Sequence, residues 1–220
     1  MMTLDLFYYV FAPNYAFRQA ALPTLRERFP YGWEEIWAQT LRWQRRLKPN
    51  RPRHTFSVNM MMRQMEWNLA LYRALKDHRL PLKEAGPIIE AVGMKVYRPS
   101  PAFLYTVSRL RSAKRGARVK WVLSILTGYF FSAAFIHRQR KPEEGEVVAF
   151  DVTRCPLADY FKTMGSPEAT PFGACNLDYG AAETFGVDLV RSQTIADGSA
   201  YCDFRWRIKG LQRSPHRTSQ

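Results

Sequence analysis

Three cysteines, Cys155, Cys175 and Cys202, carry the side chains in this sequence best suited to nucleophilic chemistry. Cys155 follows a stretch of alternating residues and precedes Pro156, and proline fits the first position of a helix. A thiol at a strand-to-helix junction lies near unpaired backbone N–H groups and the positive end of the helix, which lower its pKa. Cys155 is therefore a candidate nucleophile, and the alternative is an unreactive cap residue.

Cys175 and Cys202 lie in different local patterns. Cys175 precedes Asp178 by three residues, so both side chains share one face if this segment is a helical turn. A carboxylate beside a thiol raises the thiol pKa, so this pair favours acid/base chemistry over a standing thiolate. Cys202 alternates with Phe204 and Trp206 in an expected strand, which favours a small core residue. Asp203 and Arg205 lie on the opposite face, where they could pair or anchor a carboxylate substrate.

The number and spacing of the cysteines argue against two common roles, a disulfide framework and a metal site. Three cysteines cannot form a paired disulfide framework, and their odd number argues against a secreted scaffold. Their spacings of 20 and 27 residues contain no Cys-x-x-Cys pair and no nearby histidine, so no metal site and no cofactor are predicted. The apolar N-terminus carries Asp5 where a secretory signal would carry cations. We therefore expect a reduced, cytoplasmic protein.

Periodicity predicts the elements that must position these residues. Apolar residues recur at helical spacing in 33–47, 57–76 and 82–92, with Gly93 ending the third helix, and the run Met60–Met62 is interpreted as core filling. Residues 146–154 alternate as a strand, and a short helix follows over 157–164. Residues 187–195 and 200–208 form a predicted hairpin around Asp197-Gly198. The expected fold is α+β, with a helical N-terminal part packed on a C-terminal antiparallel sheet that contains the strand–helix unit and the β-hairpin.

We expect a helical, basic part over 1–140, an α+β core over 141–209 and a flexible tail over 210–220, with a linker at 141–145. These parts are expected to form one integrated domain.

The net charge of +14 lies entirely in the first part of the chain. Residues 1–120 hold 22 Lys or Arg against 8 Asp or Glu, whereas residues 121–220 hold 11 of each. A basic surface attracts anionic lipid or nucleic acid, although a solvated helical surface explains the same charges. The apolar run 121–136 has 16 residues, fewer than the roughly 20 that a membrane-spanning helix needs. It is interpreted as a core helix, with a helix in the membrane interface as the alternative.

A longer pattern near the C-terminus points to a family. The segment from Val190 to Gly198, followed by Cys202-Asp203-Phe204-Arg205, resembles the terminal signature of the L-2-amino-thiazoline-4-carboxylic acid hydrolase family. Arg154-Cys155-Pro156 and Cys175–Asp178 resemble the earlier cysteine positions of that family. The resemblance implies a hydrolase that opens a 2-aminothiazoline ring to give N-carbamoyl-cysteine. The family's C-terminal architecture is also similar to the 4-vinyl reductase type of small-molecule-binding domain, which leaves a non-enzymatic binding module as an alternative.

The resemblance also implies roles for particular residues. The catalytic set is Cys155, Cys175, Cys202 and Asp178, with Cys155 or Cys175 as the nucleophile and Asp178 as the proton shuttle. Arg191 would clamp a substrate carboxylate and Asp203 would hold the substrate amino group or an arginine. Thr194 and Arg205 complete the expected substrate-binding group.

The expected partner is a small-molecule substrate, without a cofactor. Peripheral contact with an anionic membrane and a homodimer are also compatible with the sequence. Nucleic acid ranks last because the basic residues show no docking motif. The cationic first half and the apolar run 121–136 depart from a hydrolase of a small polar molecule and favour a larger or more apolar ligand. The alternative function is a non-enzymatic binding protein for an apolar small molecule or a membrane surface.

Overall fold

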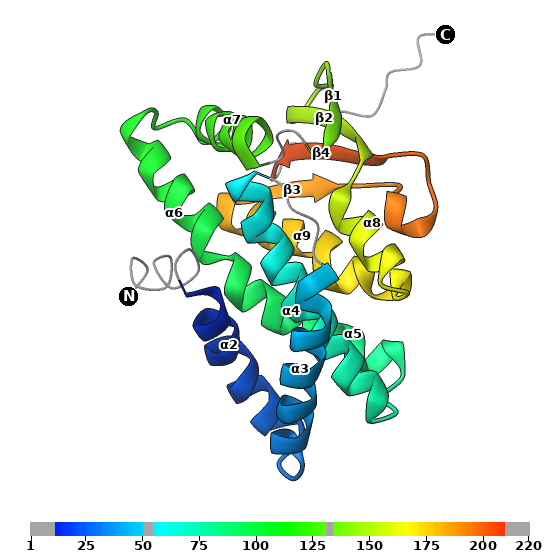
Figure 1. The fold of residues 1–220 in the computed structure, drawn as a ribbon. Coiled ribbons are helices and arrows are strands. Elements are labelled where there is room, and N and C mark those ends of the chain that lie inside the picture. Colours follow the sequence, from blue (N-terminus) through cyan, green and yellow to red (C-terminus); the bar gives the residue numbers. More distant parts are fainter. Residues whose placement is uncertain (1–11, 51–54, 131–133, 210–220) are drawn as a thin grey trace, which may run out of the picture.

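The computed structural model describes residues 12–50, 55–130 and 134–209 of the chain. Helices dominate the first part, and an antiparallel sheet with two further helices forms the second part (Figure 1). This arrangement confirms the expected α+β class. The helices of the first part are α2 (Pro13–Arg28), α3 (Trp33–Leu47), α4 (Phe56–Asp77), α5 (Leu82–Tyr97), α6 (Pro99–Val107) and α7 (Arg115–Ile125). The second part contains β1 (Ile136–Arg140), β2 (Glu146–Arg154), α8 (Pro156–Thr163), α9 (Leu177–Phe185), β3 (Val187–Val190) and β4 (Cys202–Ile208).

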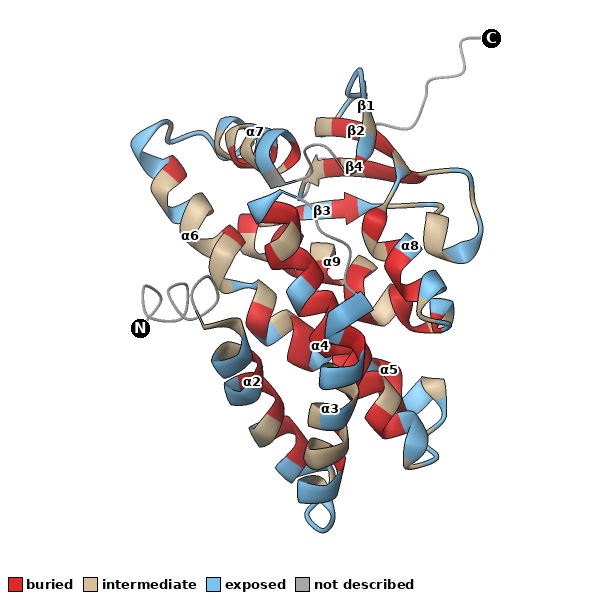
Figure 2. Cartoon of the chain, viewed as in Figure 1, coloured by how far each residue is buried: buried red, intermediate tan, exposed pale blue. Residues whose placement is uncertain are grey.

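Helix α4 forms the centre of the molecule. It lies between the pair α2 and α3 at one end of the view and the sheet at the other, and Figure 2 shows it buried over most of its length. The sequence explains this position, because α4 contains no glycine or proline and carries large apolar residues on every side. Met60, Met61 and Met62 are all buried, which confirms that the methionine run fills the core.

Two polar side chains on α4 reach across the core to neighbouring backbone. Gln64 donates to the carbonyl of Gly93 at 2.9 Å, and Asn68 donates to the carbonyl of Gly173 at 2.6 Å. Gly93 was predicted to end its helix, but α5 continues to Tyr97. The glycine instead permits a close approach, because a Cβ at this position would lie 3.0 Å from Nδ2 of Asn68.

The four strands form one antiparallel sheet in the order β1-β2-β4-β3. β2 and β4 pair with Phe150 opposite Phe204, and their rings stack with centroids 4.8 Å apart. Because side chains alternate along a strand, Val152, Cys202 and Phe204 share the face that packs against the helices. The predicted strand 146–154 and the predicted apolar face of Cys202 are confirmed.

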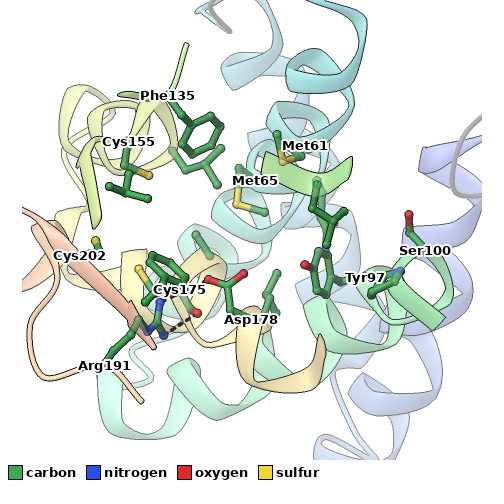
Figure 3. Close-up of a pocket in the computed structure, with 18 residues that line it drawn as sticks. Met61, Met65, Tyr97, Ser100, Phe135, Cys155, Cys175, Asp178, Arg191 and Cys202 are labelled. Atoms are coloured by element: carbon green, nitrogen blue, oxygen red, sulfur yellow. Dashed lines mark hydrogen bonds and ion pairs between the residues drawn. The ribbon is translucent and has the colours of Figure 1, made fainter. Parts of the chain in front are cut away.

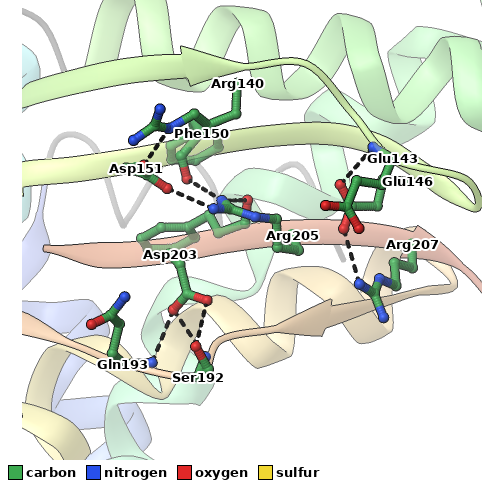
Figure 4. A network of polar contacts seen from close by, with 11 residues as sticks. Arg140, Glu143, Glu146, Phe150, Asp151, Ser192, Gln193, Asp203, Arg205 and Arg207 are labelled. Atoms are coloured by element: carbon green, nitrogen blue, oxygen red, sulfur yellow. Dashed lines mark hydrogen bonds and ion pairs between the residues drawn. The ribbon is translucent and has the colours of Figure 1, made fainter.

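The other face of the sheet carries an ion network around Asp151 (Figure 4). Arg205 on β4 donates to this carboxylate at 2.8 Å, and Arg140 on β1 donates to its second oxygen. Arg205 also donates to the carbonyl of Phe150 at 3.0 Å. Asp151 is 1% exposed, so one buried carboxylate on β2 joins three neighbouring strands.

Two predicted elements differ from the structure. The apolar run 121–136 is not a single core helix, because α7 ends at Ile125, a π-helical turn covers Leu126–Phe130, and Ile136 begins β1. Residues 131–133 lie outside the described part. The cause is strand pairing, since β1 forms an antiparallel ladder with β2. The linker 141–145 is accordingly the turn between these two strands, and the boundary at residue 140 falls within a hairpin.

The C-terminal hairpin is also shorter than predicted. β3 ends at Val190, and it pairs with the second half of β4, from Arg205 to Ile208. The connection beyond Val190 leaves the sheet because the carboxylate of Asp203 accepts hydrogen bonds from the backbone N–H groups of Ser192 and Gln193, each at 2.9 Å. Asp197-Gly198 does form a turn, with Gly198 in the left-handed conformation at φ 90°.

Within the described residues, no helix combines the length and the apolar character needed to cross a membrane.

The ion network predicts a measurable contribution to stability. Asp151→Asn should lower the free energy of unfolding by about 2 kcal/mol, because a neutral amide cannot compensate two arginines. Urea denaturation at pH 7 measures this change, with Asp188→Asn, exposed on β3, as the control.

The pH dependence of this loss distinguishes a charged network from simple packing. Burial raises the pKa of Asp151, but the hydrogen bonds from Arg205 and Arg140 outweigh burial and hold the pKa below its usual value. The stabilisation is therefore present above the unfolded pKa and is lost as the pH falls through the folded pKa. The difference in the free energy of unfolding between wild type and Asp151→Asn should therefore become smaller below about pH 4. A difference in unfolding free energy that stays constant down to pH 2 would contradict stabilisation by the charge of Asp151.

Candidate functional site

A cavity of about 90 Å³ lies between α4, the junction of α5 and α6, and the sheet. All three cysteines line it together with Asp178 and Arg191 (Figure 3). In this view Cys155, Cys175, Cys202 and Arg191 lie on one side, with Asp178 between them and the residues on the opposite side. The fold thus brings together five of the residues singled out by the sequence, from four separate segments of the second half.

Cys155 occupies the junction between β2 and α8, with Pro156 at the first helical position as predicted. The prediction of a lowered pKa is wrong. Burial raises the pKa of Cys155 to about 12, although the backbone N–H groups of Ala158 and Leu157 act in the opposite direction. The helix terminus contributes as expected, but the loss of water around the sulfur is the larger effect. Cys155 therefore rests as a thiol.

Cys175 ends a π-helical turn, Pro171–Cys175, and Asp178 lies in the first turn of α9. Burial raises the pKa of Cys175 far above its usual value, and the neighbouring Cys155 raises it further. This agrees with the prediction that a thiol beside Asp178 is not a standing thiolate. The backbone that carries Cys175 is held by Asn68 of α4 through the carbonyl of Gly173.

Cys202 begins β4 and is 6% exposed. Its Sγ accepts a hydrogen bond from the backbone N–H of Ile195 at 3.2 Å. Burial is the largest influence on its pKa, which lies above the usual value. Cys202 is thus a core residue of the sheet whose sulfur also contributes to the cavity surface.

Asp178 and Arg191 form the charged pair of the cavity. Nη1 of Arg191 lies 3.3 Å from Oδ2 of Asp178, and Nη2 donates to the carbonyl of Cys175 at 2.8 Å. The guanidinium lies over the rings of Tyr179 and Phe204, at 4.7 Å and 5.2 Å from their centroids. These contacts leave the Arg191 side chain 3% exposed, whereas the Asp178 side chain keeps 21%. Asp178 is therefore the accessible member of the pair.

The environment tunes Asp178 toward proton transfer. Burial raises the pKa of Asp178 to about 6, and the charge of Arg191 limits this rise. A carboxyl group with a pKa near 6 exchanges protons readily near neutral pH. Asp178 also acts electrostatically on all three thiols, since its charge raises the pKa of Cys155, Cys175 and Cys202. The arrangement provides a base and three neutral thiols around one small space.

Three residues of the expected substrate-binding group do not line the cavity. Thr194 caps the short 3-10 turn Ile195–Asp197, where its hydroxyl contacts Asp197 at 2.7 Å. The carboxylate of Asp203 accepts the hydrogen bonds from Ser192 and Gln193. The predicted pairing of Asp203 with Arg205 does not occur, because Arg205 pairs with Asp151 across the sheet.

The opposite wall of the cavity was not predicted. It is formed by Met61, Gln64 and Met65 of α4, by Tyr97, Ser100 and Pro101 at the α5–α6 junction, and by Leu126 and Phe135. The periodicity of α4 indicated only that Met61 and Met65 are buried, and core residues and cavity residues share the same pattern. No group of three or more metal-binding side chains occurs within the described ranges.

Comparison with known proteins gives a family match that spans the cavity residues. The family model described as L-2-amino-thiazoline-4-carboxylic acid hydrolase matches residues 60–206, which run from α4 to β4 and contain all the cavity residues. No curated protein and no solved structure gave a match.

Proposed function

Because the chain belongs to the L-2-amino-thiazoline-4-carboxylic acid hydrolase family, we propose that it hydrolyses a cyclic amidine-like substrate with the participation of a cysteine. The observation that carries this proposal is the gathering of three thiols and the Asp178–Arg191 pair around one cavity. A carbon bonded to two nitrogens and one sulfur is open to attack by a thiolate or by an activated water.

Cys155 is the nucleophile in this proposal. The backbone N–H groups of Leu157 and Ala158 favour the charged form of this thiol. Their dipoles therefore stabilise a negative charge on the Cys155 sulfur. Asp178 takes the thiol proton, because it is the accessible carboxylate of the cavity and acts electrostatically on each thiol. An amidinium substrate adds positive charge next to the sulfur and lowers the thiol pKa when it binds.

The reaction proceeds in two balanced steps. The Cys155 thiolate adds to the amidine carbon, the ring C–S bond breaks, and the substrate sulfur leaves as a thiol after taking a proton. The enzyme then holds an S-amidino thioether. Water, deprotonated by Asp178, adds to the same carbon, the bond to the Cys155 sulfur breaks, and the product leaves as a urea. One water is consumed for each ring opened, and the Cys155 thiol is restored.

Arg191 acts as a positioning residue. It holds Asp178 through one nitrogen and the carbonyl of Cys175 through another, so it links the base to the segment that carries Cys175. Its charge also limits the pKa of Asp178, which keeps the carboxylate ionised near neutral pH. The expected role of Arg191 as a clamp for a substrate carboxylate is replaced by this one.

The nucleophile can be identified with single substitutions. Cys155→Ser should lower kcat/KM for opening of a 2-aminothiazoline ring by at least about 100-fold, because serine is a far weaker nucleophile in a site without a strong base. Cys175→Ser and Cys202→Ser should cost less, and circular dichroism checks that each variant folds. Full activity in all three variants would exclude the cysteine route. Full activity in all three cysteine variants with loss in Asp178→Asn would mean that water attacks the ring directly, whereas loss only in Cys175→Ser and Asp178→Asn would make Cys175 the nucleophile.

Asp178 should define the acidic limb of the pH profile. Since the base must be ionised, kcat/KM should fall as the pH drops below about 6. Arg191→Met removes a charge that lowers this pKa, so the limb should move to higher pH, whereas Arg191→Lys should keep it near 6. A limb that does not move in Arg191→Met would show that another group controls the profile.

We also propose a second function, peripheral contact with an anionic membrane, which rests on the loop between α6 and α7. Leu110 is 92% exposed there, and Arg109, Arg111 and Lys114 are exposed beside it. Arg118 fixes the base of the loop by donating to the carbonyl of Tyr105 at 2.8 Å and by stacking on the Tyr105 ring at 3.9 Å. An apolar tip surrounded by cations suits the boundary between lipid headgroups and acyl chains.

Liposome flotation tests this second candidate. Leu110→Ser should weaken binding to vesicles that contain phosphatidylserine by several-fold, and raised salt should weaken it further. Tyr31→Ser is the matched control, since Tyr31 is 96% exposed at the turn between α2 and α3, away from this loop. Equal binding by both variants, or no binding at low salt, would rule out this surface.

A further inference from the structure

One wall of the cavity is apolar. Met61 and Met65 on α4, Leu126 in the π-helical turn and Phe135 before β1 line it, and we call these four residues the apolar wall. Met65 is 3% exposed and Phe135 is 8% exposed, so this surface is closed to bulk solvent over most of its area. A polar substrate group placed against these four side chains would lose its hydration without gaining hydrogen bonds from them.

The cavity holds little positive charge for an acidic substrate. Among the described residues that line it, Arg191 is the only lysine or arginine. Its charge is balanced by the Asp178 carboxylate, its Nη2 also donates to the carbonyl of Cys175, and its buried Nε has no hydrogen-bond partner among the described residues. The accessible charge is therefore the carboxylate of Asp178, which repels a substrate carboxylate and attracts a protonated amidine.

These observations disagree with a substrate that carries a carboxylate, as the compound in the family name does. We infer that this chain takes a cyclic amidine whose ring bears an apolar substituent in place of the carboxylate. The amidine lies against Asp178 and the thiols, and the substituent lies against the apolar wall. The inference rests on the proposed function for the ring chemistry, but it concerns binding and is measured separately.

The size of the cavity limits the substituent. The cavity volume is only about 90 Å³, so a short branched alkyl group fits better than a long chain. Each methylene moved from water to an apolar surface raises affinity about fourfold. A four-carbon substituent that is partly buried should therefore raise affinity by at least about tenfold over the unsubstituted ring.

The test uses three ligands with the wild-type protein. They are 2-amino-2-thiazoline, its 4-carboxylate and its 4-isobutyl derivative. Calorimetry gives the Kd of each at pH 7.5, and a thiol assay on the same samples detects ring opening. The 4-isobutyl compound should bind at least about tenfold more tightly than the unsubstituted ring, and the 4-carboxylate should bind more weakly than both.

Each outcome has a separate meaning. Tighter binding of the 4-carboxylate, or no binding of any of the three, would overturn the inference. Tight binding of the 4-isobutyl compound without ring opening would support the inference and contradict the proposed hydrolase activity. Ring opening confined to the 4-carboxylate would support the hydrolase activity and contradict the inference.

A substitution in the apolar wall provides an independent test. Leu126→Arg introduces a cation beside the position where the substituent is expected, and Leu126 is half-buried, so the longer side chain can be accommodated without burying the charge completely. The preference should reverse, with the 4-carboxylate gaining affinity and the 4-isobutyl compound losing it. Leu82→Arg, half-buried at the start of α5 and outside the cavity, is the matched control and should leave the order unchanged.

Discussion

The buried ion pair between Asp178 and Arg191 is the interaction on which the site depends. It joins the first turn of α9 to the connection after β3, and Arg191 also lies over the ring of Tyr179 in the same turn of α9. The cost of burying a guanidinium is offset by the carboxylate, by the carbonyl of Cys175 and by the faces of two aromatic rings. Because every one of these partners belongs to the cavity wall or its support, loss of Arg191 would release the base and the Cys175 segment together.

Polar side chains elsewhere hold the same cavity by tying loops to regular elements. Asn68 on α4 holds the turn that carries Cys175, and Asp203 on β4 holds the backbone that follows Arg191. In both cases a side chain from a helix or strand forms hydrogen bonds with the backbone of an irregular segment. Functional groups on such segments need this support to keep their positions. Asp203 and Arg205, which were expected to bind substrate, do not line this cavity, and their contacts are with the chain itself.

Local sequence patterns predicted those parts of the fold that local forces decide. The periodicity of α3 and α4, the alternation in β2 and the Cys155-Pro156 junction all depend on near neighbours, and each is confirmed. The segment after Leu126 depends on the pairing of Ile136 with β2, and the end of β3 depends on the carboxylate of Asp203. Neither of these contacts produces a periodic pattern in the sequence. The prediction of a lowered pKa for Cys155 failed for a related reason. The sequence indicates the helix terminus next to this thiol, but it does not indicate how deeply the thiol is buried.

The ionisation of Asp178 carries a cost that argues for a role beyond structure. Its folded pKa of about 6 lies above the ordinary value of 3.8, so protonation favours the folded state. That stabilisation is fully present below the unfolded pKa and is lost as the pH rises through the folded pKa. At neutral pH the chain therefore holds a carboxylate that weakens its own fold. An asparagine would avoid this penalty, but it would leave the buried guanidinium of Arg191 without a countercharge. A carboxylate with a raised pKa that lines a small cavity beside three thiols is the kind of group expected where chemistry or cation binding uses the charge.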